Sequence, residues 1–260
     1  MKRYIIFFIL ALFTLGISAQ TRGHNNRRPA GKISLDIHDN LQYENKKGFT
    51  ASLSKDIFDN HTYKDSNGNE IIYSKEIWPK FLGYYQDDEY ELFYWLIDSH
   101  QRKTNNKESY KIDIFGALQY QGNDGLNASL SKDVFDNKIY QDSRGNKVSY
   151  SKEFWPEIYA DFHGDEINIL YWLLDRFWKI ERYQEEYSVD IFDSLKFKNN
   201  KNNSASLSKD VFDNKVYKDS NGNDIKYKPS AWNKIIKKNG SEQKAFISLI
   251  YSHLLNLPNE

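Results

Sequence analysis

The sequence predicts an α+β protein of three tandem 77-residue repeats, each with two β-hairpin modules followed by two helices. Three observations lead to this prediction. The sequence repeats itself, short runs of strand-forming residues flank typical turn residues, and helix start and stop signals lie in the second half of each repeat.

The repeat needs no gaps. The segment ASLSKDIFDNHTYKDSNGNEIIY, residues 51–73, recurs at residues 128–150 and 205–227, and 15 of its 23 positions are identical in all three copies. The same shift aligns three tryptophans, Trp78, Trp155 and Trp232. A fixed period of this length is typical of repeat proteins. We therefore divide the chain into a signal peptide, a flexible leader and three repeats, at residues 1–19, 20–31, 32–108, 109–185 and 186–260.

Hairpins are predicted where polar turn residues separate strand formers. In the middle repeat, Tyr140 precedes and Val148 follows the polar stretch DSRGN, residues 142–146. Asp at the start of a turn, with Gly three places later, favours a type I turn followed by a left-handed residue. The SKD(I/V)FDN stretch between hairpins is expected to form a corner with one helical turn. Its Phe would point inward, and its Asp and Asn would bond to backbone amides.

Helices are predicted in the second half of each repeat. Pro229 is a good helix start and Asn239-Gly240 a good stop, and the matching helices are expected to begin near Pro79 and Pro156. A second helix is expected over residues 88–100, 165–179 and 241–255. Its middle copy is apolar on nearly every face, so we expect it to be buried between its own sheet and the next repeat.

The N-terminus predicts export. Lys2 and Arg3 precede an apolar run, residues 4–15, and small residues follow up to Ala19. This pattern is typical of a secretory signal peptide cut after Ala19, and the run is short for a transmembrane helix. We expect an exported protein, in the bacterial periplasm or outside the cell, with no stable membrane insertion. An uncleaved anchor is the alternative.

Composition excludes several classes of protein. The 36 basic and 36 acidic residues balance, which argues against a nucleic-acid binder that relies on bulk positive charge. The absence of cysteine excludes disulfides, thiolate metal sites and a cysteine nucleophile. No catalytic motif is present, so we expect a non-catalytic protein without a cofactor. A hydrolase with two paired carboxylates is the open alternative, because motifs do not reveal one.

A calcium site is the alternative for the Asp-rich stretches. The oxygens of Asp56, Asp59, Asp65 and Asn69 are the type of ligand that calcium prefers. The stretch does not match an EF-hand, because Tyr63 would stand where the loop needs its first carboxylate. Asp and Asn are also the ordinary residues of turns, and we take them as such.

A partner-binding surface is expected where the repeats differ. The loops between the two helices of each repeat vary, and they supply our candidate partner-binding residues: Tyr84, Tyr85, Asp161, His163 and Lys238. Variable loops on a shared scaffold are typical of recognition. The expected partner is another protein, for example one inhibited in an immunity-type role. The alternative is a cell-surface glycan, since aromatic rings also stack on sugars.

Overall fold

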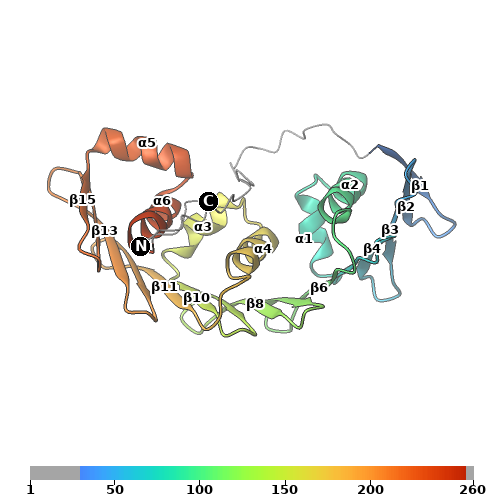
Figure 1. Ribbon diagram of the computed structural model, residues 1–260, viewed down its shortest axis with the longest axis horizontal. Helices are drawn as coiled ribbons and strands as arrows, with labels where there is room; N and C mark the ends of the chain where they lie inside the picture. The colour runs from blue at the N-terminus through green and yellow to red at the C-terminus, as the bar shows by residue number, and fades with distance from the viewer. Residues whose placement is uncertain (1–29, 256–260) are drawn as a thin grey trace, which may run out of the picture.

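A single 15-stranded sheet organises the molecule. The computed structural model describes residues 30–255, and in them the sheet curves into an arch with six α-helices on its concave side (Figure 1). The order of the strands across the sheet is their order in the sequence. The predicted α+β class is confirmed. The predicted signal peptide and most of the leader lie outside the described residues.

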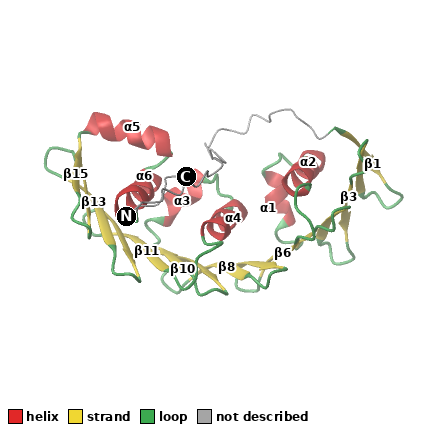
Figure 2. Ribbon diagram, in the orientation of Figure 1, coloured by secondary structure: helices red, strands yellow, loops and turns green. Residues whose placement is uncertain are grey.

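Strands and helices alternate in groups along the chain (Figure 2). Five strands are followed by two helices, and this order occurs three times. The first group is β1 Gly31–Leu35, β2 Leu41–Asn45, β3 Thr50–Lys55, β4 His61–Asp65, β5 Glu70–Tyr73, α1 Trp78–Gly83 and α2 Glu89–His100. The second is β6 Lys107–Ile112, β7 Leu118–Gly122, β8 Asn127–Lys132, β9 Lys138–Asp142, β10 Lys147–Tyr150, α3 Trp155–Asp161 and α4 Glu166–Arg176. The third is β11 Gln184–Val189, β12 Leu195–Asn199, β13 Ser204–Lys209, β14 Lys215–Asp219, β15 Asp224–Tyr227, α5 Pro229–Asn239 and α6 Glu242–Leu249, which continues as a π-helix, Ile250–Leu254.

The hairpin turns lie at the two ends of the strands, and we call these two sides the edges of the sheet. Neighbouring strands are antiparallel except for the pairs β5/β6 and β10/β11, which are parallel and are connected through two helices each. The turns β1–β2, β3–β4, β6–β7, β8–β9, β11–β12 and β13–β14 therefore all lie at one edge. The other six hairpin turns lie at the opposite edge.

The predicted hairpin turn is confirmed at the opposite edge. Gln141 of β9 pairs with Lys147 of β10, and Gly145 has a φ of 83°. Its amide donates to the carbonyl oxygen of Asp142 at 3.1 Å. Glycine suits this position because other residues are strained at positive φ.

The predicted corner is wrong. In residues 131–137, Lys132 pairs with Lys138 and Asp136 has a φ of 65°, so the segment is a second tight hairpin turn. Phe135 is 73% exposed rather than directed inward. The central residues of such a turn lie beyond the end of the sheet, so their side chains cannot reach the core. Each group of strands consequently has five members and not the four that two hairpins supply.

The helix predictions agree closely with the structure. α5 runs from Pro229 to Asn239, and Gly240 ends it with a φ of 98°. α1 and α3 begin at the tryptophan before the expected proline. α4 ends at Arg176, a few residues earlier than expected.

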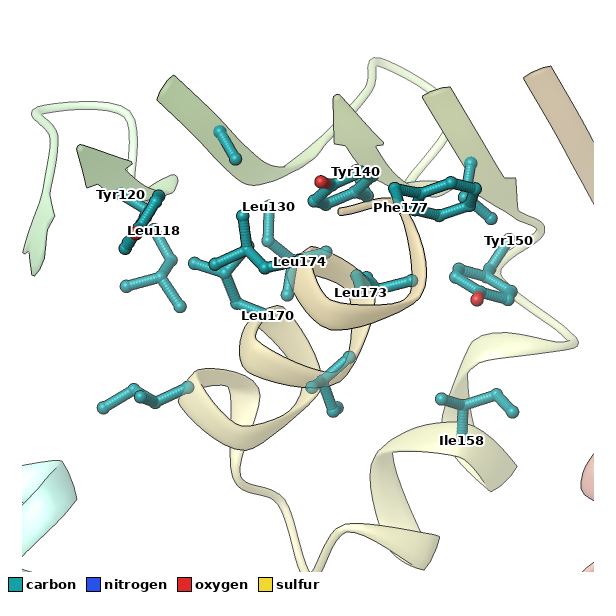
Figure 3. Close-up of a cluster of buried hydrophobic side chains, with 14 of the residues drawn as sticks. Leu118, Tyr120, Leu130, Tyr140, Tyr150, Ile158, Leu170, Leu173, Leu174 and Phe177 are labelled. Atoms are coloured by element: carbon teal, nitrogen blue, oxygen red, sulfur yellow. The ribbon is translucent and has the colours of Figure 1, made fainter. Parts of the chain in front are cut away.

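The core lies between the concave face of the sheet and the helices. Figure 3 shows Leu170 and Leu174 of α4 directed toward Leu118 and Leu130 of the sheet, and all four are buried. Each such side chain contributes roughly 1.5–3 kcal/mol by leaving water. The expected packing of α4 against the strands of its own group is confirmed. Within residues 30–255, no helix has the length and apolar character needed to cross a bilayer.

Candidate functional site

One edge of the sheet carries a row of exposed apolar side chains. We call the edge with the turns β1–β2, β3–β4, β6–β7, β8–β9, β11–β12 and β13–β14 the apolar edge. The central positions of these turns hold eleven Ile, Val and Phe side chains that are 69% to 93% exposed. They are Ile37, Ile57, Phe58, Ile114, Phe115, Val134, Phe135, Ile191, Phe192, Val211 and Phe212.

Each turn of the apolar edge is held by its first aspartate. Oδ1 of Asp56 accepts the amides of Phe58 at 2.8 Å and Asn60 at 2.9 Å, and Oδ2 accepts the side-chain amide of Asn60. The hydrogen bond from the Asn60 side chain is the main reason that the pKa of Asp56 is lowered. These contacts fix the backbone and leave the two apolar side chains pointing into solvent.

Turn geometry does not require apolar residues there. The turns at the opposite edge have the same backbone hydrogen bonds. Gly48 N donates to Asn45 O at 3.0 Å there, just as Asp39 N donates to Asp36 O at 3.2 Å at the apolar edge. The central residues of those turns are all polar: Lys46-Lys47, Ser66-Asn67, Asn123-Asp124, Ser143-Arg144, Asn200-Lys201 and Ser220-Asn221. Stability therefore does not explain the apolar pairs, and an accumulation of exposed apolar side chains on one side of a protein indicates an interaction site.

A groove opens beside the apolar edge at the middle of the sheet. Its volume is ≈ 540 Å³, and it lies between α1, the β6–β7 turn and the loop from α3 to α4. Tyr84 on one side is 39% exposed and Tyr159 on the other is 41% exposed. Asp165 and Glu166 add carboxylates to its lining. Burial, with these carboxylates and Tyr159 nearby, raises the pKa of Tyr84.

A glycine shapes this groove. Gly164 has a φ of 82°, and a Cβ there would approach the Tyr159 hydroxyl to 3.1 Å. Because Gly164 has no side chain, the loop that carries His163 can lie close to the Tyr159 ring.

The five predicted partner-binding residues do not form one site. Tyr84 and His163 both line the groove. Tyr85 packs against Phe81 and Trp95, at ring distances of 6.0 and 6.1 Å.

The other two candidates lie elsewhere. Asp161 accepts a hydrogen bond from Ser241 and lies 3.8 Å from the ammonium of Lys244, so it joins α3 to α6. Lys238 is exposed on α5.

The four alternative calcium ligands are divided between the two edges. Asp56 and Asp59 belong to the β3–β4 turn at the apolar edge, whereas Asp65 and Asn69 belong to the β4–β5 turn at the opposite edge. Strand β4 separates them by about 13 Å at roughly 3.3 Å per residue. Among residues 30–255, no group of three or more His, Asp or Glu side chains is placed to hold a metal ion.

The apolar edge was missed because its residues look like core residues. Ile-Phe and Val-Phe pairs normally indicate burial. The spacing contained the signal: in 133–137 an Asp and an Asn enclose three residues, as they do in the recognised turn at 142–146.

Comparison with known proteins adds little. No protein-family model matches the chain, and no curated protein matches it. One solved structure, the G-box domain of the microcephaly protein CPAP, covers 77% of this chain and 99% of its own at 6% sequence identity, with a TM-score of 0.17. A likeness this low carries no argument about fold or function.

Proposed function

We propose that this is an exported, non-catalytic recognition protein that binds another protein through the apolar edge. One observation carries the proposal: two sets of turns share a backbone geometry, yet only the set at one edge has apolar central residues. Exposing eleven large apolar side chains has a solubility cost that a binding function accounts for.

The surroundings of the apolar pairs favour a protein partner. Beside each of three pairs lies an exposed ion pair: Lys55–Asp59 at 3.2 Å, Lys132–Asp136 at 3.5 Å and Lys209–Asp213 at 2.6 Å. Apolar centres with a charged rim are typical of protein interfaces. Successive turns of this edge within a group are about 10 Å apart, because neighbouring strands lie 4.7–4.9 Å apart. A long partner surface can therefore contact several turns at once.

We also propose that the three groups are tandem repeats at residues 32–108, 109–185 and 186–260. The 77-residue sequence period and the recurring order of elements support this division. Repetition would supply the regular spacing of the apolar pairs. An inhibitor or immunity-type protein is one form that such a recognition function takes.

The test uses affinity capture of residues 20–260 from the exported fraction, with mass spectrometry. The variant Phe58→Ser/Phe135→Ser/Phe212→Ser changes the apolar edge, and Lys46→Ser/Lys47→Ser changes the opposite edge as a matched control. We expect a stoichiometric protein partner on the wild type and on the control, and its loss from the triple variant. Retention by the triple variant, or no partner on the wild type, would contradict the proposal.

A glycan is the second candidate, and the groove is the observation that favours it. Two half-exposed tyrosines, Tyr84 and Tyr159, line it, and their rings can stack on a sugar. Calorimetric titration of the wild type and of Tyr84→Ala/Tyr159→Ala with cell-surface oligosaccharides tests this. Binding that depends on the two tyrosines would favour the glycan over the protein partner.

A further inference from the structure

The two parallel junctions of the sheet each bury a glutamate. Glu108 on β6 lies opposite Ile71 of β5, and Glu185 on β11 lies opposite Val148 of β10. Each accepts a hydrogen bond from the tyrosine two residues later, Tyr110 Oη at 2.7 Å and Tyr187 Oη at 3.1 Å. Both carboxylates therefore have the same setting in their strands.

The second junction provides its glutamate with an internal cation. The guanidinium of Arg176, at the end of α4, forms a short ion pair with Glu185, and the arginine side chain is only 9% exposed. Three aromatic rings surround this guanidinium: Trp172 at 5.6 Å, Phe177 at 4.9 Å and Tyr251 at 4.8 Å. A buried carboxylate is thus neutralised inside an aromatic cage.

The first junction lacks this arginine. The 77-residue shift aligns Arg176 with Ser99, Trp172 with Trp95 and Phe177 with His100. Ser99, Trp95 and His100 line a cavity of ≈ 240 Å³, and Tyr171 of α4 lines it from the other side. The cavity therefore lies where the second junction holds the arginine side chain.

The cavity wall contains unused hydrogen-bonding capacity. His100 is 1% exposed, and its Nδ1 lies 2.8 Å from the Leu96 carbonyl oxygen and so carries the proton. Its Nε2 has no hydrogen-bond partner among the described residues. Burial, followed by the charge of Lys103, lowers the pKa of His100, so the ring is neutral and accepts a donor.

Glu108 is within reach of this cavity. Its Oε2 lies 3.4 Å from the hydroxyl of Tyr171, and its Oε1 lies 3.7 Å from the ammonium of Lys103. Both of these partners line the cavity. The Lys103 side chain is 44% exposed. It can therefore move into solvent when a cation that binds Glu108 more tightly enters the cavity.

We infer that the cavity between α2 and α4 binds a guanidinium group, such as the side chain of an arginine in a partner or in a peptide. The guanidinium stacks among Trp95, His100 and Tyr171, donates to His100 Nε2 and displaces the Lys103 ammonium from Glu108. A guanidinium is favoured over an ammonium because its planar face stacks on rings while its edge donates several hydrogen bonds. The site is distinct from the apolar edge and does not depend on the function proposed above.

The test uses the full chain and methylguanidinium chloride as the probe, with methylammonium chloride as the comparison. We expect millimolar methylguanidinium to raise the Tm of the wild type relative to Ser99→Arg, in which an internal guanidinium fills the cavity. Methylammonium should raise it less. The salt has the same denaturing effect on Ser99→Arg as on the wild type. The difference between the two proteins in the change of Tm on adding the salt therefore reports binding to the cavity.

Two further variants keep the inference open to disproof if Ser99→Arg does not fold. Glu108→Gln should lose the response to methylguanidinium. Arg176→Ser should lower the Tm and gain a second response, because it opens the matching cavity at the other junction. An equal response of wild type and Ser99→Arg, or an unchanged response of Glu108→Gln together with no gain in Arg176→Ser, would overturn the inference.

Discussion

The rings of Tyr73 and Tyr110 stack at 5.4 Å, with 13° between their planes, across the parallel junction of β5 and β6. Tyr150 and Tyr187 stack in the same way at 5.3 Å and 16° across β10 and β11. All four side chains are at most 1% exposed. The antiparallel groups of the sheet are therefore joined by buried tyrosine pairs where no hairpin turn connects them.

Removing one of these rings should weaken the whole sheet. We expect Tyr187→Ala to lower the free energy of unfolding by about 3–5 kcal/mol, because a large buried aromatic is replaced by a cavity. The measurement is urea denaturation followed by circular dichroism. Tyr90→Ala, at a side chain that is 46% exposed, is the control and should change stability by less than about 0.5 kcal/mol. An unchanged midpoint for Tyr187→Ala would show that the junction does not contribute to stability.

Asn146 should contribute more to the free energy of unfolding than other asparagines in hairpin turns. It is 1% exposed, donates to the Ile180 carbonyl oxygen at 2.7 Å and accepts the amide of Tyr183 at 3.1 Å. We expect Asn146→Ala to cost roughly 2–3 kcal/mol, since the buried Tyr183 amide and the part-buried Ile180 carbonyl both lose their partner.

Asn137→Ala is the matched control, because that asparagine bonds to Asp133 at 2.9 Å in a turn of the apolar edge. It should cost about 1 kcal/mol or less. Hydrogen exchange of the Tyr183 amide provides a local readout. Equal losses of stability in the two variants would contradict the idea that Asn146 connects its turn to the segment between α4 and β11.

His61 should make stability depend on pH. Its ring stacks on Trp78 at 4.0 Å, and burial, followed by the charge of Lys55, lowers its pKa from 6.5 to about 4. Below pH 6.5 the unfolded chain takes up a proton on this residue while the folded protein does not. Stability from this group is therefore present above pH 6.5, falls as the pH drops toward 4 and is level below that.

The variant that tests this is His61→Lys. Lysines occupy the matching positions, and Lys138 pairs with Glu166 at 2.6 Å while His61 lies 3.8 Å from Glu89. We expect the difference in unfolding free energy, wild type minus variant, to decrease between pH 6.5 and 4. A difference that is constant over this range would show that His61 titrates normally in the folded protein.

Substitutions at two left-handed turn positions should differ in how much stability they cost. Gly145 has a φ of 83°, so Gly145→Ala should cost about 1 kcal/mol in strain. Asp136 has a φ of 65°, so Asp136→Gly should cost less than that, because relief of strain offsets the loss of an exposed ion pair with Lys132. Thermal unfolding of the two single variants compares them directly, and a larger loss for Asp136→Gly would contradict the assignment.

The sequence predicts the parts of this fold that depend on neighbouring residues. The turn at 142–146 and helix α5 each carry their signals within a dozen residues, so both were recognised. The predicted corner at 131–137 is wrong because the apolar character of Phe135 suggests burial, whereas the backbone places it outside the sheet. The sequence does not predict the junctions, because parallel pairing joins β5 to β6 across two helices. The alternation of Glu108 with Tyr110, which Glu185 and Tyr187 repeat, is the signal that could have indicated a buried strand there.

The consecutive order of the 15 strands has a consequence for biosynthesis. Each strand pairs with the one made just before it, so no segment has to be inserted between two strands that are already paired. Contacts between segments close in sequence form early and quickly. The sheet can therefore grow from β1 onward as the chain emerges N-terminus first, and each finished strand offers a template to the next.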